Sequence, residues 1–408
     1  MKLRVLILPR HTPQAASCRH RFSQYLSYFE AHGFECDVST FFDERYTAAV
    51  LRGGQKQWWR FGKAAIRRLL AVLKARRYDL VVVHAEFIPY LPHGFERWLA
   101  QLAIPYLVDF DDAYFHAYDQ HSSGLVRGLL GEKIGRLMQT AELNVAGSDY
   151  LAAYARRFSS QVSVVPTVVD LARYPSAPTE PDPTCFSIGW IGSPTTTPYL
   201  QSVMGELAAF AKGRNVQILA IGARRFDAGD APVRFIDWSE DTEVEQLARA
   251  HVGIMPLPQT PWAEGKCGFK LIQTMACWRP VVASPVGANC RIVQDGVSGL
   301  HARPGEWRAA MERLYESAAL RMQFGAAGRQ TVEREYSLEV WAPRVAALWS
   351  HAAARDTEAL SMDVLTHTWV DVSAGGGSLL AGQAAHWPAT RRGTDVEPRP
   401  VSSRSSQR

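Results

Sequence analysis

The sequence predicts an α/β protein with two Rossmann-like parallel-sheet domains that face each other across a cleft. Short apolar runs alternate with helical patterns, the alternation occurs twice, and a proline-rich segment separates the two series. A chain of 408 residues, 47% hydrophobic and 21% charged, is long enough for more than one packed core. Ligands bind such sheets at the carboxyl ends of the strands, so we expect a site in the cleft.

The first series defines an N-terminal domain of residues 1–165. We expect buried strands at 3–8, 79–85, 105–110 and 143–148, where apolar and β-branched residues form short continuous runs. Between them lie helical patterns, such as residues 21–32, which Gly33 closes. Strands that alternate with helices in this way indicate βαβ units.

Residues 166–184 form a predicted linker, because their prolines oppose both helices and central strands. A second domain, residues 185–337, repeats the pattern with strands expected at 186–192, 216–222, 252–257 and 280–287. A helix is expected at 338–354, and it could pack back on the first domain. Residues 355–408 lose this periodicity and are rich in Gly, Ser, Thr, Arg and Pro, so we predict a disordered tail.

The composition limits the partners and the compartment. A formal charge of +5 and a pI near 8.9 suit anionic ligands or an anionic membrane surface but are too weak to indicate nucleic acid. The six cysteines are scattered and include no CxxC pair, which favours a reducing compartment without a zinc site. The first apolar run is too short for a signal peptide, and no run approaches the roughly 18 apolar residues that span a bilayer. We therefore expect a cytoplasmic protein, or one attached to the inner face of the cell membrane.

The most informative segment is residues 264–289, EGKCGFKLIQTMACWRPVVASPVGAN. Two sets of side chains recur at helical spacing on opposite sides: the apolar Leu271, Ile272, Met275 and Ala276, and the polar Lys270, Gln273, Thr274 and Cys277. We expect one side to pack and the other to recognise a ligand, although an ordinary amphipathic helix with a solvated polar side fits this pattern equally well. The start of the helix suits an anion, with Gly268 allowing close approach and Lys266 and Lys270 supplying positive charge.

Several common chemistries lack their motifs in this sequence. No GxGxxG turn follows the first strand of either domain, because the first strand runs into PRHTP and the second domain has GWIGSP. The sequence also contains no GxxxxGK[ST] loop and no GxSxG elbow. Dinucleotide-dependent dehydrogenases, P-loop enzymes and elbow-type hydrolases are therefore disfavoured.

The remaining motifs carry a family resemblance over roughly residues 1–350. GWIGSPTTTPYL at 189–200, the segment at 254–289 and DGVSGLHA at 295–302 resemble the donor-binding half of retaining, nucleotide-sugar-dependent glycosyltransferases of family 4, which have the two-domain GT-B fold. CRHRFSQYLSYFEAHG at 18–33, DFDDA at 109–113 and AGSDYLAAYARRF at 146–158 are similar to the bacterial branch that builds polysaccharides and glycolipids. The resemblance implies sugar transfer from a UDP- or GDP-sugar to a glycan or lipid-linked acceptor, with retention at the anomeric carbon and without a metal or cofactor.

This chain departs from the family at its donor-site carboxylates. In the family, a glutamate that contacts the transferred sugar and a second that contacts the ribose are separated by seven residues. Aligned on Met275, these positions are Gly265 and Gln273. The resemblance then implies that Gln273 bonds the ribose and that the neighbouring Glu264 serves the sugar if its loop shifts, the alternative being that Glu264 is an exposed loop acid.

The family also binds the donor diphosphate with basic residues after the first strand of the second domain, and this chain has none there. The predicted donor-binding residues are therefore Gly192, Ser193, Glu264, Lys266, Gly268, Phe269, Lys270 and Gln273, with Lys270 the strongest candidate for the diphosphate.

Acidic and basic residues of the first domain complete the predicted site. Asp109, Asp111 and Asp112 end a strand, and Asp111 or Asp112 is expected to orient or deprotonate an acceptor hydroxyl. A cation site, or aspartates that cap a helix or face water, are the alternatives. Arg21 is the candidate contact for the donor or an anionic acceptor, and His84 is a further candidate that a structural role explains as well.

A basic segment predicts a membrane contact. Residues 52–77 contain nine Lys or Arg residues and no acid, interleaved with aromatic and aliphatic residues. Such a helix binds anionic headgroups, although a solvated basic helix of the first domain fits equally well. Two other functions stay open: a catalytically inactive sugar-nucleotide-binding or scaffold protein of the same fold, and a nucleotide-sugar epimerase.

Overall fold

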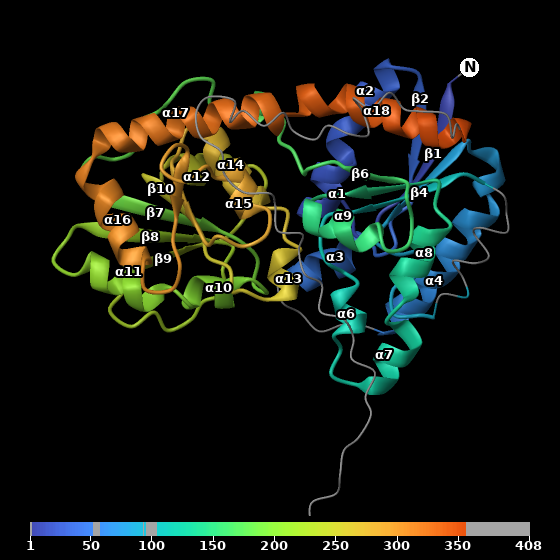
Figure 1. Ribbon diagram of the computed structural model, residues 1–408, viewed down its shortest axis with the longest axis horizontal. Helices are drawn as coiled ribbons and strands as arrows, with labels where there is room; N and C mark the ends of the chain where they lie inside the picture. Colours follow the sequence, from blue (N-terminus) through green and yellow to red (C-terminus); the bar gives the residue numbers. More distant parts are fainter. Residues whose placement is uncertain (1, 52–57, 93, 95–103, 356–408) are drawn as a thin grey trace, which may run out of the picture. The chain divides into compact units, whose positions relative to one another are not determined.

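A computed structural model describes residues 2–51, 58–92, 94 and 104–355. In this part, the chain forms two six-stranded parallel sheets, each flanked by helices (Figure 1). The prediction of two Rossmann-like parallel sheets is confirmed. The predicted tail at 355–408 lies outside the described residues except for Arg355.

The first sheet, together with its helices, is called the N-terminal lobe. Its strand order is β2-β1-β3-β4-β5-β6, and every pair is parallel. The strands are β1 (Leu3–Leu8), β2 (Phe34–Val38), β3 (Leu80–His84), β4 (Tyr106–Phe110), β5 (Leu143–Ala146) and β6 (Val162–Val164). The chain moves outward from β1 first to β2 and then to the other side through β3, so the topological switch point lies between β1 and β3.

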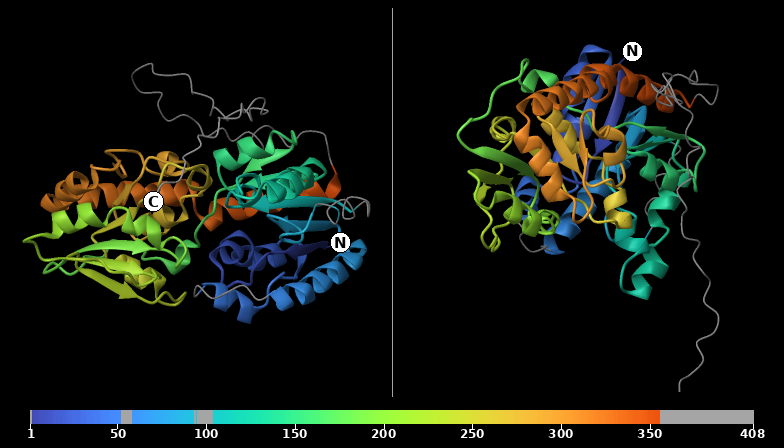
Figure 2. Two further views of the ribbon diagram at one scale, coloured as in Figure 1. Left: turned by 90° about the horizontal axis from the view of Figure 1, so that it is seen from below. Right: turned by 60° about the vertical axis from the view of Figure 1, so that its left-hand side comes forward.

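Eight α-helices of the described residues belong to this lobe, with short 3-10 turns at Ser23–Tyr25 and Ala75–Arg77. They are α1 (Ala16–Arg21), α2 (Leu26–Ala31), α3 (Glu44–Leu51), α4 (Trp58–Leu73), α6 (His116–Asp119), α7 (Gly124–Leu130), α8 (Lys133–Gln139) and α9 (Asp149–Ala155). The inner strands β3, β4 and β5 are buried along their whole length, because helices cover both faces of the sheet (Figure 2).

The second sheet, together with its helices, is called the C-terminal lobe. Its strand order is β12-β11-β10-β7-β8-β9, again all parallel. The strands are β7 (Phe186–Ile191), β8 (Val216–Ile221), β9 (Val233–Ile236), β10 (Val252–Met255), β11 (Val281–Ala283) and β12 (Gly299–His301). The switch point lies between β7 and β10, so the segments that follow these two strands meet at one edge of the sheet.

The helices of the C-terminal lobe include the segment that the sequence singled out. They are α10 (Thr197–Gln201), α11 (Met204–Ala211), α12 (Glu243–Ala248), α13 (Pro261–Glu264), α14 (Phe269–Ala276), α15 (Asn289–Ile292), α16 (Trp307–Glu316) and α17 (Ala318–Glu335). The last described helix, α18 (Leu338–Ala354), contacts α2, β3 and β4, and its Trp349 lies 4.5 Å from Phe29 between ring centroids. The chain therefore returns to the N-terminal lobe after completing the second sheet.

The segment between the lobes has little regular structure of its own. It contains the 3-10 turn Leu171–Arg173 and an isolated bridge between Val169 and Ser337. The Val169 amide donates to the Tyr336 carbonyl at 3.0 Å, and the Leu338 amide donates to the Val169 carbonyl at 2.8 Å. These bonds tie the connecting segment to the beginning of α18.

The predicted basic segment at 52–77 corresponds to α4 and the turn after it, while residues 52–57 lie outside the described residues. Ile66, Leu70 and Leu73 are 61%, 54% and 56% exposed on α4. Arg68 is instead buried and donates to the Leu8 and Pro9 carbonyls at the end of β1. No helix of the described residues is both long enough and apolar enough to cross a bilayer.

Candidate functional site

The loop after β7 brings backbone and hydroxyl groups to the switch point of the second sheet. The Ser193 amide donates to Thr196 Oγ1 at 3.0 Å, and the Ser193 and Thr195 hydroxyls lie 2.9 Å apart. A Cβ at Gly192 would lie 2.1 Å from the Trp190 ring, so only glycine fits there without movement of the indole. The predicted residues Gly192 and Ser193 therefore form a tight loop whose hydroxyl groups bond one another.

Lys270 lies at the second position of α14, beside this loop. Its ammonium group is 6.0 Å from the centroid of the Trp190 ring, the ring that also limits Gly192. Within the described residues, Lys270 Nζ forms no ion pair or hydrogen bond. Burial, followed by the charge of Lys266, lowers the pKa of Lys270 to about 8. The structure thus places a half-buried cation without a counterion at the switch point.

Lys266 has a different environment. Its Nζ lies 2.6 Å from Asp112 Oδ2 in the N-terminal lobe, and 5.4 Å from the centroid of the Trp262 ring. Burial acts to lower the pKa of Lys266, but the ion pair with Asp112 outweighs it and raises the pKa. Lys266 is therefore charged, and its charge is neutralised by Asp112. The charge of Lys270 is not neutralised by an ion pair among the described residues.

Residues 265–267 pack directly against the N-terminal lobe. A Cβ at Gly265 would lie 2.4 Å from the Ala113 Cβ, and a Cβ at Gly147 would lie 2.4 Å from Cys267 Sγ. The Cys267 thiol also donates to the Asp111 carbonyl at 2.7 Å. With the lobes in this arrangement, no side chain fits at 265, the position to which the resemblance assigned the first glutamate.

The other predicted donor-binding residues lie around α14. Glu264 is half-buried, and its Oε2 accepts from the Gly287 amide at 2.9 Å. Gly268 precedes α14 with φ of 65°, and a Cβ there would lie 2.2 Å from Ile292 Cδ1. The group that approaches Gly268 closely in this structure is therefore the Ile292 side chain. Phe269 packs on the His20 ring at 4.3 Å between centroids.

Three of the four residues on the polar side of α14 are buried, so the prediction of an exposed polar side is wrong for them. Gln273, Thr274 and Cys277 are 3%, 4% and 0% exposed, because α12 and strand β10, whose Gly253 lies against Thr274, cover these residues. Gln273 hydrogen-bonds Tyr174, whose pKa is raised mainly by burial. Lys270, near the beginning of the helix, is the member of this set that keeps partial exposure.

The three aspartates at the end of β4, of which Asp109 lies within the strand and Asp111 and Asp112 follow it, bind three different partners. Asp109 binds the Arg21 guanidinium through both oxygens, at 2.9 and 2.6 Å. Asp111 Oδ1 lies 3.2 Å from His84 Nε2, and Asp112 binds Lys266. The three carboxylates therefore do not converge on one point in this structure, and the described residues contain no group of three or more His, Cys, Asp or Glu side chains arranged for a metal ion.

The pKa values of Asp111 and Asp112 are shifted in opposite directions, and the two carboxylates have different hydrogen-bond partners. Burial acts to raise the pKa of Asp111, but the His84 hydrogen bond and nearby positive charge lower it overall. The pKa of Asp112 is raised, mainly by burial, although Lys266 opposes this. Asp112 Oδ1 is buried and has no hydrogen-bond partner in the described part of the chain. Asp112 is thus bound to Lys266 through one oxygen, whereas its other oxygen is buried and unpaired in the described part of the chain.

Arg21, the predicted contact for a donor or acceptor, is 4% exposed. Besides its two bonds to Asp109, it donates to the Val165 carbonyl at 2.6 Å. A phosphate contact would have to displace one of these bonds. The sequence did not indicate this pairing, because the two residues are 88 positions apart.

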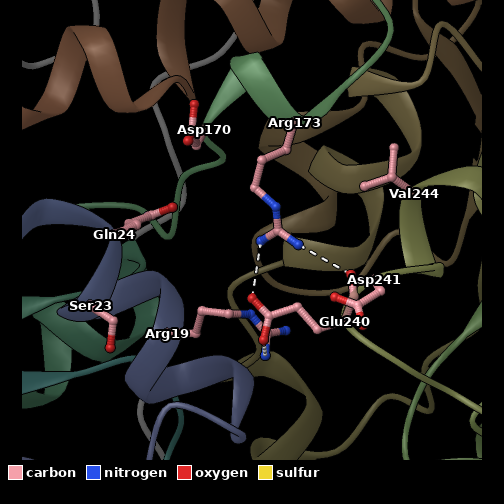
Figure 3. Close-up of a pocket in the computed structure, with 8 residues that line it drawn as sticks. All are labelled: Arg19, Ser23, Gln24, Asp170, Arg173, Glu240, Asp241 and Val244. Carbon is pink, nitrogen blue, oxygen red and sulfur yellow. Dashed lines mark hydrogen bonds and ion pairs between the residues drawn. The ribbon is translucent and has the colours of Figure 1, made fainter.

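A cavity of about 610 Å³ opens where α1, the connecting segment and α12 meet (Figure 3). Its walls are charged and polar, and consist of Arg19, Ser23, Gln24, Asp170, Arg173, Glu240, Asp241 and Val244. Arg19 and Arg173 form ion pairs with Glu240, at 3.3 and 3.5 Å. Sequence reasoning missed this cavity, because its residues come from three distant segments without a shared motif.

Two family comparisons cover most of the two lobes. Residues 23–173 match the family described as Glycosyltransferase Family 4, and residues 187–317 match Glycosyl transferases group 1. Among curated proteins, none matches the chain significantly.

Solved structures share the fold over most of the chain. Sucrose-phosphate synthase from Thermosynechococcus elongatus is 17% identical with a TM-score of 0.64, over 87% of this chain and 100% of that one. HepE of Anabaena, in complex with UDP and glucose, is 15% identical with a TM-score of 0.62, over 85% of this chain and 99% of that one. WaaG, a glycosyltransferase involved in lipopolysaccharide biosynthesis, is 15% identical with a TM-score of 0.64, over 85% and 100%. At these identities the likeness shows the shared GT-B fold.

Proposed function

We propose that this chain, a GT-B protein with a glycosyltransferase family 4 region and a glycosyl transferases group 1 region, transfers a sugar from a nucleotide-sugar donor to a glycan or lipid-linked acceptor with retention at the anomeric carbon. The observation that carries the proposal is Lys270. A half-buried ammonium group without a counterion, beside an amide and hydroxyl loop at the switch point of a parallel sheet, suits a diphosphate.

Sugar transfer of this kind depends mainly on stabilisation of the nucleoside diphosphate, which is the leaving group. As the bond between the anomeric carbon and the phosphate oxygen breaks, negative charge develops on the nucleoside diphosphate. Lys270 supplies preorganised positive charge for it, and the Thr195 amide and Lys266, once Lys266 leaves Asp112, add to this charge. The acceptor oxygen forms its bond on the same face of the sugar, and its proton passes to the departing phosphate. The Asp112 carboxylate, whose Oδ2 lies 2.6 Å from Lys266 Nζ, orients the acceptor hydroxyl.

The cavity of Figure 3 supports a place for the nucleoside. Arg173 lines it, and the adjacent Tyr174 is the residue that Gln273 bonds, so the predicted ribose contact and the cavity are neighbours. Carboxylates such as Glu240 accept hydrogen bonds from base amino groups and sugar hydroxyls. The contacts of Gln273 with ribose and of Glu264 with the sugar stay predictions.

The test is calorimetric titration of UDP and GDP into the protein and two matched variants. Lys270→Ala is expected to weaken binding much more than Lys266→Ala, because Lys266 must first leave Asp112 before it gains a phosphate contact. Equal and negligible effects of both substitutions would refute the assignment of Lys270.

A second candidate is a catalytically inactive sugar-nucleotide-binding protein. It is favoured by the absence of a carboxylate at Gly265 and Gln273 and by the bond between Glu264 and the Gly287 amide. Release of nucleoside diphosphate from UDP- or GDP-sugars, measured with and without glycan or lipid extracts, separates the two. Binding without any release would establish the inactive protein, and donor interconversion without release would indicate an epimerase.

We also propose that α4 docks on the inner face of the cell membrane, which presents the lipid-linked acceptor to a cytoplasmic enzyme. Ile66, Leu70 and Leu73 are exposed at helical spacing, with the exposed bases Arg67 and Lys74 beside them. A basic helix with an exposed apolar stripe binds anionic headgroups and inserts its apolar side chains.

The membrane contact predicts salt-sensitive sedimentation with vesicles that contain phosphatidylglycerol. Ile66→Ser with Leu70→Ser is expected to abolish it, whereas Leu125→Ser with Leu129→Ser, which removes two exposed leucines from α7, is the control. Loss of binding in the α7 variant alone would assign the contact to α7 and overturn the role of α4.

A further inference from the structure

Two ammonium groups and one carboxylate meet where the N-terminal lobe touches the beginning of α14. Lys266 is bound to Asp112 at 2.6 Å, and Lys270 is close enough to both for their charges to alter its pKa. Two positive charges and one negative charge leave a net charge of +1 on these three side chains. The diphosphate of a sugar nucleotide carries two negative charges, so matching it requires both lysines rather than Lys270 alone.

The geometry allows Lys266 to change partner without separation of the lobes. The Cys267 thiol bond to the Asp111 carbonyl and the contact of Gly265 with Ala113 hold the backbones beside Lys266 and Asp112 together. Lys266 and Asp112 are 17% and 24% exposed, so the ion pair is reachable from the cleft but only partly screened by water. A rotation of the flexible lysine side chain is enough to exchange a carboxylate for a phosphate.

We infer that the donor diphosphate competes with Asp112 for the Lys266 ammonium, so that donor binding releases the Asp112 carboxylate to receive the acceptor. This inference rests on the proposed function and concerns the regulation of the same site. Before the donor binds, Lys266 holds Asp112 Oδ2, and Oδ1 is buried without a hydrogen-bond partner in the described part of the chain. Afterwards Oδ2 is released and is available to an acceptor hydroxyl, which orders the reaction with the donor first.

The test is calorimetric measurement of the Kd for UDP and GDP in the full chain and its variants. Asp112→Asn frees Lys266 in advance, and the inference predicts roughly three- to tenfold tighter binding of nucleoside diphosphate. Removal of a negative charge near the site would also reduce simple repulsion of the ligand. The double variant with Lys266→Met separates these causes, because the gain must disappear when Lys266 is absent.

Asp149→Asn is the matched control. It breaks another ion pair between the lobes, Asp149 with Arg291 at 2.5 Å, and is expected to leave the Kd unchanged. Asp112→Ser replaces Asp112→Asn if the latter does not fold, as judged by its thermal transition.

Equal or weaker binding by the Asp112 variants would overturn the inference and leave the proposed function standing. A gain that persists with Lys266→Met, or that Asp149→Asn reproduces, would also overturn it. Failure of the wild-type protein to bind any nucleoside diphosphate would overturn the proposed function itself, and this result is seen before any variant is compared.

Discussion

The protonation of Lys270 makes donor binding depend on pH in a window where an ordinary lysine does not titrate. Burial and the neighbouring Lys266 lower the pKa of Lys270 to about 8, from the ordinary value of 10.5. A bound diphosphate favours the charged ammonium and raises this pKa again. Affinity is therefore expected to be highest below pH 8, to fall above it, and to be accompanied there by uptake of a proton.

The size of the effect follows from the protonated fraction of Lys270. With a pKa of about 8, that fraction falls from about 75% at about pH 7.5 to about 10% at about pH 9. The Kd for UDP or GDP is expected to rise roughly eightfold over this range, which is about 1.2 kcal/mol. Lys266 keeps its charge because the ion pair with Asp112 raises its pKa, and the last phosphate ionisation, near pH 6 to 7, is largely complete.

The assay is calorimetry of UDP or GDP binding across this pH range in buffers with different ionisation enthalpies. The Lys270→Arg variant is the control, because a guanidinium keeps its charge and should flatten the profile. Kd values that do not change with pH in the wild-type protein, or that rise equally in Lys270→Arg, would refute the assignment of a lowered pKa and a phosphate contact to Lys270.

Two further predictions concern stability, measured as the free energy of unfolding in urea. Arg21→Met leaves Asp109 buried without its partner and is expected to lower this free energy by about 3 kcal/mol, whereas a loss below about 1 kcal/mol would show that the pair is not structural. Gly268→Ala combines a positive φ with a contact 2.2 Å from Ile292 Cδ1, while Gly213→Ala has a similar φ of 74° and open space. Backbone strain should lower the free energy of unfolding by about 1 kcal/mol in each variant. The contact with Ile292 should add a further loss in Gly268→Ala only, so equal losses would contradict the steric argument.

The inner strands of both sheets could be predicted, but the outer ones could not. β1, β3, β4 and β5 and their counterparts β7, β8, β10 and β11 all lie within the predicted ranges, because strands covered on both faces are continuous apolar runs. The four strands outside the predicted ranges are β2, β6, β9 and β12, which are the edge strands of the two sheets. Edge strands are short or partly exposed, and β2 reads FECDV with only one buried residue. Their pairing depends on a neighbouring strand and leaves little trace in the local sequence.

The candidate site shows the same division between local pattern and tertiary contact. Ser193 and Asp112, near the ends of strands, and Lys270, near the start of a helix, could be located because strand ends and helix starts have local signatures. The exposure and the bonding partner of each side chain could not be predicted from the sequence. Gln273 lies on the polar side of an amphipathic pattern, but α12 covers that side.

The sequence by itself determined the fold class, the two series of βαβ units and the loops at the carboxyl ends of the central strands, because hydrophobic periodicity is a local property. Only the tertiary structure decided the charge state of the site. It joined Arg21 to Asp109 and Lys266 to Asp112, pairs that are 88 and 154 positions apart. It also left Lys270 Nζ without an ion pair among the described residues, because the strength of an electrostatic interaction depends on distance and burial, which the order of residues does not specify.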